Sequence, residues 1–155
     1  MSAARALGLG AISGLRSLSG PVFVSRAASR GDLNLDGTPF AFLGSSRLAK
    51  ALLLMELGEL AGDKLPLTPS RTALPLILGR AASGGVVGAA IFVSAGRRAT
   101  TGAALGSTAA IAAAFAGERL RALAVERTGL PGLVIALAED AIVFLVGFRT
   151  LGDVR

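Results

Sequence analysis

The sequence predicts an all-α fold: a single integral membrane domain over residues 1–155, a polytopic bundle of about five helices packed through Gly and Ala. Of the 155 residues, 52% are hydrophobic and only 17% are charged, against about 25% charged in soluble domains. No charge occurs from Ala99 to Gly117, and Arg80 is the only one from Thr72 to Gly96. Such segments are apolar on every face and long enough to cross an apolar core of about 30 Å.

The expected spans are residues 6–26, 48–62, 73–96, 100–120 and 130–148. Polar, turn-rich connections separate them, and Pro66, Pro69 and Pro131 stand at segment boundaries, where they disrupt no helix interior. The second span is short, so we expect its helix to begin upstream, near Ser45 or Ser46. The apolar stretch 38–44 is too short to cross and predicts a lid or an interfacial turn.

Residues 1–31 allow another interpretation, because they contain four Arg residues, several Ser and no acid. This composition is typical of an organellar transit peptide, and a signal peptide is a second alternative. An internal repeat argues against removal, since the segment resembles one in the body of the chain. The motif R-x-x-S-G occurs at residues 16–20 and again at 80–84. Both copies lie in mid-segment, and paired Gly/Pro interruptions of this kind point to a transporter binding site.

Pairs of glycines four residues apart predict close helix contacts. Small residues let membrane helices approach one another, because lipid is as apolar as Leu and supplies no hydrophobic drive. A composition rich in Gly and Ala also produces such pairs by chance. The four pairs are Gly10/Gly14, Gly58/Gly62, Gly84/Gly88 and Gly102/Gly106.

Ionisable side chains inside the spans are the main functional signal. A charge at a helix centre opposes insertion by about 2.5–3.5 kcal/mol, so it must face the bundle, a partner or water. We expect Arg16 and Arg80 to pair with Glu59, Glu118 and Glu139, and a buried carboxylate could carry a proton. The predicted polar seam comprises Arg16, Ser19, Glu56, Glu59, Asp63, Arg80, Ser83, Glu118, Glu139 and Asp140.

The missing residue types exclude several classes of site. Cys, His, Trp and Tyr are all absent, which removes disulfides, thiol nucleophiles, imidazole-bound zinc and histidine acid–base chemistry. We therefore expect no catalytic residue, no metal and no cofactor. The formal charge of +6 comes from basic residues scattered at segment ends, so we expect no nucleic-acid partner.

The strings GLRSLSGP (14–21), GELAGDKLPLTPSRT (58–72) and LPGLVIALAEDAI (130–142) resemble bacterial membrane proteins that carry domain of unknown function 4126. The most specific part is D-K-L-P-x-T-P-S-R-T, from Asp63 to Thr72. The resemblance implies a small multi-span protein and shared motifs that include Arg16, Asp63, Lys64, Arg71, Glu139 and Asp140. It implies no established activity.

The leading hypothesis is a small transporter or channel for an ion or small polar solute, in the bacterial cytoplasmic membrane. The second is a non-catalytic scaffold whose charges are structural ion pairs. An enzyme is a distant third, because no nucleophile–base pair is visible. The lipid bilayer is the expected partner, and the sequence also allows a homo-oligomer. Eight basic residues on one side against six on the other leave the orientation undecided.

Overall fold

The computed structural model describes residues 2–62 and 73–152, and over these it is all α, as expected, with no strand. The elements are α1 (Ser2–Leu15), α2 (Ser19–Ser29), the 3-10 helix η1 (Ala41–Gly44), α3 (Ser46–Gly62), α4 (Leu74–Ser94), α5 (Ala99–Thr128) and α6 (Gly132–Gly152).

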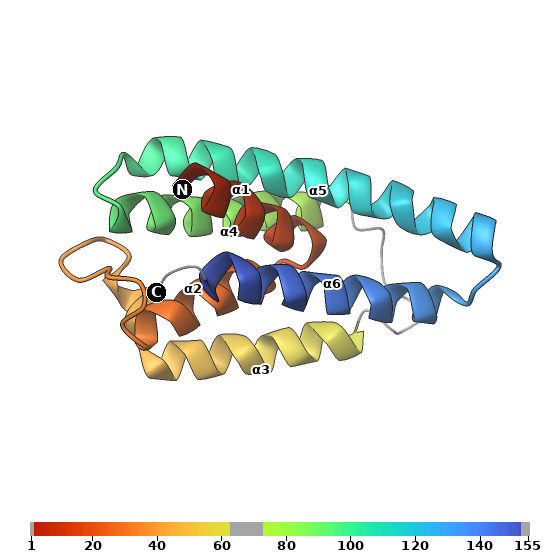
Figure 1. The fold of residues 1–155 in the computed structure, drawn as a ribbon, viewed down its shortest axis with the longest axis horizontal. Helices are drawn as coiled ribbons and strands as arrows, with labels where there is room; N and C mark the ends of the chain where they lie inside the picture. Colours follow the sequence, from red (N-terminus) through yellow and green to blue (C-terminus); the bar gives the residue numbers. More distant parts are fainter. Residues whose placement is uncertain (1, 63–72, 153–155) are drawn as a thin grey trace.

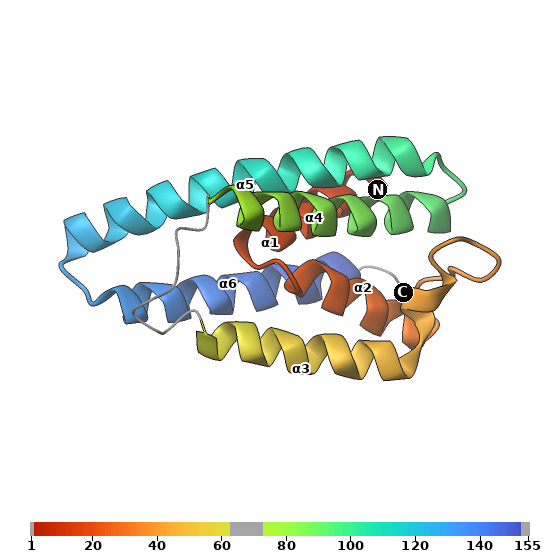
Figure 2. The same ribbon diagram turned by 180° about the vertical axis from the view of Figure 1, so that it is seen from behind.

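The first expected span, residues 6–26, is not one helix. The chain leaves α1 at Leu15 and reverses direction, so that α2 runs back toward the end where α1 began (Figures 1 and 2). Pro21 gives the physical reason, because it has no N–H for the carbonyl of Ser17 and its ring crowds that carbonyl. With 14 and 11 residues, α1 and α2 are about 21 and 17 Å long. Neither reaches across a core of about 30 Å.

The second R-x-x-S-G motif does not interrupt its helix. α4 is continuous from Leu74 to Ser94 and passes through Arg80 and Gly84 without a break. The prediction of paired interruptions is therefore wrong for this copy. The residue after Gly84 is Gly85 rather than proline, so the backbone N–H needed to continue the helix is present.

The other boundaries are close to those expected. α3 begins at Ser46, and the stretch 38–44 contains the short helix η1, whose Leu43 carbonyl accepts a hydrogen bond of 2.7 Å from Ser25 Oγ. α5 is longer than expected and continues to Thr128. It ends at Gly129, whose φ of +65° is the left-handed conformation that commonly terminates helices.

The helices form two halves joined by the reversal between α1 and α2. α1 packs on α4 and α5 and also contacts α6, whereas α2 packs on α3 and η1 and also contacts α4 and α6 (Figures 1 and 2). Buried side chains from both short helices, such as Leu9, Phe23 and Val24, form one hydrophobic core with Val87 and Phe92 of α4. The α1–α2 pair therefore lies inside the bundle.

Glycines bring α1, α4 and α5 into backbone contact. A Cβ atom on Gly10 would lie 2.6 Å from the carbonyl oxygen of Gly106, and one on Gly84 would lie 2.5 Å from the same oxygen. Gly14 lies equally close to Ala110, and Gly88 to Gly102. Six of the predicted packing glycines thus lie in one three-helix contact: Gly10, Gly14, Gly84, Gly88, Gly102 and Gly106.

The pair Gly58/Gly62 differs from the others. A Cβ on Gly58 would meet nothing within 4 Å, so this glycine makes no close helix contact within the described part of the chain, unlike the six above. Gly58 faces outward because it lies on the side of α3 opposite to Glu56, which is buried against the rest of the bundle. The surroundings of Gly62 lie outside the described residues.

In the described part of the chain, α4 and α5 are long and apolar enough to cross a membrane. α3 has 17 residues, somewhat fewer than the roughly 20 of a typical span. α6 is apolar but carries Glu139, Asp140 and Arg149.

Candidate functional site

The candidate site is the break, residues Arg16–Leu18, where the C-terminus of α1 meets the N-terminus of α2. Helix ends leave backbone carbonyls and N–H groups without intrahelical partners. Such groups are costly to bury unless other groups bond to them. Side chains from α3 and α4 supply these bonds.

Glu59 of α3 binds the N-terminal side of α2. Its carboxylate accepts hydrogen bonds from the backbone N–H of Ser17 (3.2 Å) and of Leu18 (3.3 Å), and from Ser17 Oγ (2.8 Å). A negative charge is favourable there because the helix dipole is positive at the N-terminus. Glu59 therefore acts as the anionic cap of α2.

Arg80 and Ser83 of α4 bind carbonyls on the other side of the break. Arg80 Nη1 donates to the carbonyl oxygen of Gly14 over 2.8 Å, and Ser83 Oγ donates to that of Ser17. Gly14 lies in the last turn of α1, where a positive charge is favourable. Pro21 has no N–H to donate to the carbonyl of Ser17, four residues before it, so this carbonyl needs another donor. The second R-x-x-S-G motif thus binds the first.

Arg16 forms a buried ion pair with Asp140 of α6. Its Nε lies 2.7 Å from Asp140 Oδ1, which also accepts from Nη2, and Arg16 is only 2% exposed. The expected pairing of Arg16 or Arg80 with Glu59 is wrong. Glu59 instead bonds to the N–H groups exposed by the break, which need an acceptor in this buried place.

Glu56 is fully buried beside this pair, and its Oε1 accepts a hydrogen bond from Ser19 Oγ at the start of α2. Glu56 Oε2 and Asp140 Oδ2 are buried carboxylate oxygens without a hydrogen-bond donor among the described residues. A buried carboxylate oxygen normally accepts a hydrogen bond. Asp140 is already paired with Arg16, so Glu56 Oε2 is the one of these two oxygens that has neither a donor nor an ion pair among the described residues.

Glu139 of the predicted seam contacts α5. Glu139 lies 4.0 Å from Arg121 of α5, with its side chain 18% exposed. Successive helical residues point about 100° apart, so Asp140 faces inward while Glu139 faces α5. Glu118 is half-buried on α5, and Asp63 lies outside the described residues. Seven members of the predicted seam meet at the break and form one cluster among the described residues: Arg16, Ser19, Glu56, Glu59, Arg80, Ser83 and Asp140.

The sequence prediction missed Ser17. It singled out Ser19 and Ser83 but not Ser17, which bonds through its hydroxyl, its N–H and its carbonyl. The available signal was Pro21, because a proline leaves the carbonyl four residues before it without its helical donor.

A scan against protein-family models and searches of curated proteins and solved structures found no match. The resemblance to domain of unknown function 4126 therefore stays a prediction.

Proposed function

We propose that this chain is a polytopic protein of the bacterial cytoplasmic membrane that moves an ion or small polar solute past the break. Exposed apolar surface supports the membrane location. α5 carries no charge from Ala99 to Gly117, yet only 22% of its most apolar stretch is buried within the protein, unlike the core helix of a soluble domain. Large side chains such as Leu54 of α3, Phe115 of α5 and Phe148 of α6 are more than 45% exposed and would face lipid.

The observation that carries the transport proposal is the break itself. Irregular backbone at membrane depth is tolerated where it is buried in protein or lines a polar path. Secondary transporters place substrate and ion sites between such broken helices. Here the two helix ends are bonded by Glu59 and Arg80, which come from different helices.

The residues of the cluster would have two kinds of role. Glu59, Arg80 and Ser83 hold the helix ends in place, and Arg16 with Asp140 ties the break to α6. Glu56 would be the ion-carrying group, because it is fully buried and keeps one oxygen without a donor among residues 2–62 and 73–152. A proton or a monovalent cation is the simplest species that this oxygen would bind.

The test is ion flux into liposomes that contain the purified protein, measured for H⁺ with a pH-sensitive dye in the lumen and for Na⁺ and K⁺ with ion-selective dyes. Glu56→Gln keeps an oxygen that accepts from Ser19 but cannot gain or release a proton. We expect it to lower flux about tenfold or more. Far-ultraviolet circular dichroism and elution volume check that the variant folds.

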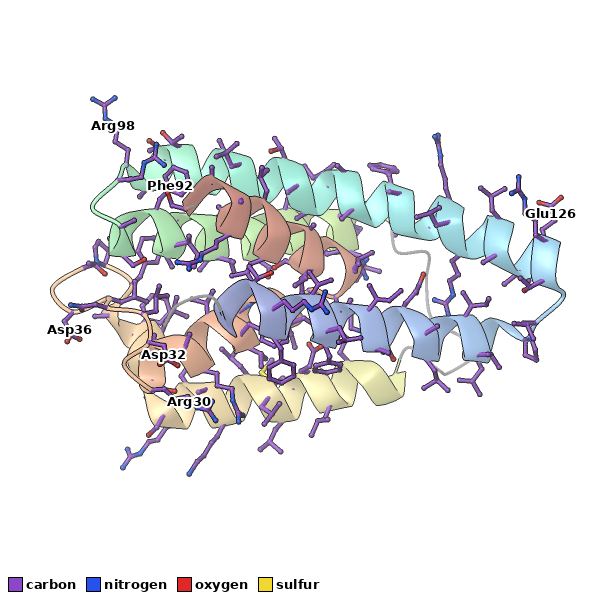
Figure 3. All side chains as sticks on the ribbon, viewed as in Figure 1. Arg30, Asp32, Asp36, Phe92, Arg98 and Glu126 are labelled. Atoms are coloured by element: carbon purple, nitrogen blue, oxygen red, sulfur yellow. The ribbon has the colours of Figure 1, made fainter. Side chains whose placement is uncertain are left out.

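Glu126→Gln is the matched control, because Glu126 is exposed at the far end of α5 (Figure 3). It should leave flux unchanged. Wild-type flux in Glu56→Gln would remove that residue from the pathway, and absence of H⁺, Na⁺ and K⁺ flux in the unsubstituted protein would sink ion transport altogether.

A non-catalytic scaffold is the second candidate. It is favoured by the bonding of Arg16, Glu59 and Arg80 to other groups of the protein, which is what a purely structural cluster requires. This alternative expects no flux of any ion and one defined membrane partner that co-purifies with the chain.

A further inference from the structure

A cavity of about 190 Å³ lies between α2 and α3, away from the break. It is smaller than the roughly 300–1,000 Å³ of pockets for drug-sized ligands, and far larger than the roughly 15 Å³ that one water molecule needs. Its size therefore suits a small group such as a phosphate with its ester oxygens. The lining residues are Val22, Arg26, Ser29, Arg30, Ser46, Ala49, Lys50 and Leu53.

The lining forms one stripe on each helix. Residues 22, 26, 29 and 30 share a face of α2, and residues 46, 49, 50 and 53 share a face of α3, by their helical spacing. α2 runs toward the end where α3 begins (Figure 1). Val22 and Leu53 are therefore at the inner end of the cavity, and the hydroxyl and basic groups are at its outer end. Small side chains, Ser29, Ser46 and Ala49, leave the space open.

The outer end of the cavity is strongly cationic. Arg26, Arg30 and Lys50 line it without any acid, and none of the three forms an ion pair with the described residues. The acids that follow α2 in sequence, Asp32 and Asp36, lie on the loop after α2 and do not line the cavity, and neither does Glu56 of α3. Three uncompensated cations around one small cavity attract an anion.

We propose that this cavity binds the phosphate of an anionic membrane lipid. Arg and Lys both bind phosphate, and Arg can do so with two parallel hydrogen bonds. Basic pockets between membrane helices recognise lipid headgroups in this way. The apolar inner end distinguishes a lipid from free phosphate: Leu57, one turn beyond Leu53 on α3, is 52% exposed and continues the apolar stripe along which an acyl chain would lie.

The inference rests on the membrane location proposed above, but not on transport. The binding test uses the full chain in neutral detergent, with dioleoyl phosphatidylglycerol, dioleoyl phosphatidylcholine or sodium phosphate added. The unfolding midpoint is followed by far-ultraviolet circular dichroism, because the chain has no Trp or Tyr. Phosphatidylglycerol should raise the midpoint in a saturable manner, and the other two additives should not.

Two pairs of variants test whether the lipid binds in this cavity: one pair changes the charge, and the other changes the space. Arg26→Gln with Lys50→Gln should weaken phosphatidylglycerol binding roughly thirtyfold, whereas Arg47→Gln with Arg98→Gln should weaken it less than about threefold. The control pair removes the same charge from exposed positions at the same end of the bundle, outside the cavity. Ala49→Leu should fill the cavity and abolish binding without changing charge, while Ala51→Leu on the exposed side of α3 should not.

Equal losses in the two charge variants would mean diffuse attraction and would overturn the site. If sodium phosphate raised the unfolding midpoint as much as phosphatidylglycerol does, the cavity would be a site for free phosphate, and the proposal that it binds a lipid would be wrong. The assay measures no flux, so intact lipid binding in a chain that transports nothing would contradict the proposed function and leave this inference standing.

Discussion

Ionisable side chains in the bundle serve chiefly to bond a broken backbone. Glu59 accepts from two N–H groups, Arg80 donates to the carbonyl of Gly14, and Arg16 is held by Asp140. Each group is buried or half-buried, where an unbonded charge or peptide group would cost several kcal/mol. The break can therefore lie only where these charged side chains reach its free backbone groups.

The Arg16–Asp140 pair leads to a prediction about stability. Arg16→Leu should lower the free energy of unfolding by about 3–5 kcal/mol, because the carboxylate of Asp140 stays buried without its guanidinium. Arg16→Leu combined with Asp140→Leu should recover most of that loss, since neither member of the pair is then left buried without its partner. Denaturant unfolding in detergent, followed by circular dichroism, measures both.

Arg121→Leu serves as the control for this pair. Arg121 lies 4.0 Å from Glu139, with the two side chains 27% and 18% exposed, so its loss should cost less than about 1 kcal/mol. A double variant at Arg16 and Asp140 that is as unstable as the single one would contradict the assignment of a buried pair.

At the scale of elements, α1, α4 and α5 form the most closely packed unit of the bundle. Gly106 lies against both Gly10 and Gly84, so that three backbones meet where any side chain would intrude. Small residues on all three helices permit this approach, and dispersion contacts then hold the helices together. These contacts hold the short helix α1 in place, and with it the break that follows its C-terminus.

Two glycine substitutions separate packing from helix propensity. Gly106→Ala should lower the free energy of unfolding by about 1–3 kcal/mol, because the new methyl group would collide with the carbonyl oxygen of Gly84. Gly58→Ala should raise it by roughly 0.5–1 kcal/mol, because Ala favours a helix and space is open at that position. Thermal unfolding in detergent compares the two, and a similar change in both would argue against backbone contact at Gly106.

At the scale of the whole molecule, the reversal between α1 and α2 places the N-terminus at the end of the bundle where α3 and α5 begin. Arg97 Nη1 donates to Ser2 Oγ over 2.8 Å, which joins the start of α1 to the turn between α4 and α5. Figure 3 shows Arg30, Asp32, Asp36 and Arg98 at this end, with Glu126 at the other. Basic residues predominate here, so we expect this end to face the cytoplasm: Arg26, Arg30, Arg47, Lys50, Arg97 and Arg98.

Cysteine labelling tests this topology on a background without native cysteine. Single variants Ala4→Cys, Asp36→Cys and Arg98→Cys should react with a membrane-impermeant maleimide from one side of sealed vesicles, and Glu126→Cys only from the other. All four positions are exposed. Opposite-side labelling of Ala4→Cys and Asp36→Cys would restore residues 6–26 as a single span and contradict the re-entrant arrangement.

Several properties could be predicted from the sequence because they depend on nearby residues. Helix content, the start of α3 and six of the packing glycines follow from apolar runs, turn residues and small residues at helical spacing. Seven members of the polar seam meet at the break because a charge in an apolar segment must find a polar neighbour. The spacing of residues in the sequence does not predict which polar group each charged side chain will contact.

The sequence alone determined that the chain is helical and apolar, and which ionisable side chains fall inside its apolar segments, since these follow from composition and period. Only the tertiary structure decided that Arg16 binds Asp140, that Glu59 caps α2 and that Gly58 faces outward. It also decided that the first R-x-x-S-G motif reverses the chain while the second continues a helix. The physical reason is that a break is stable only where distant side chains bond its free backbone groups, and those partners come together through folding.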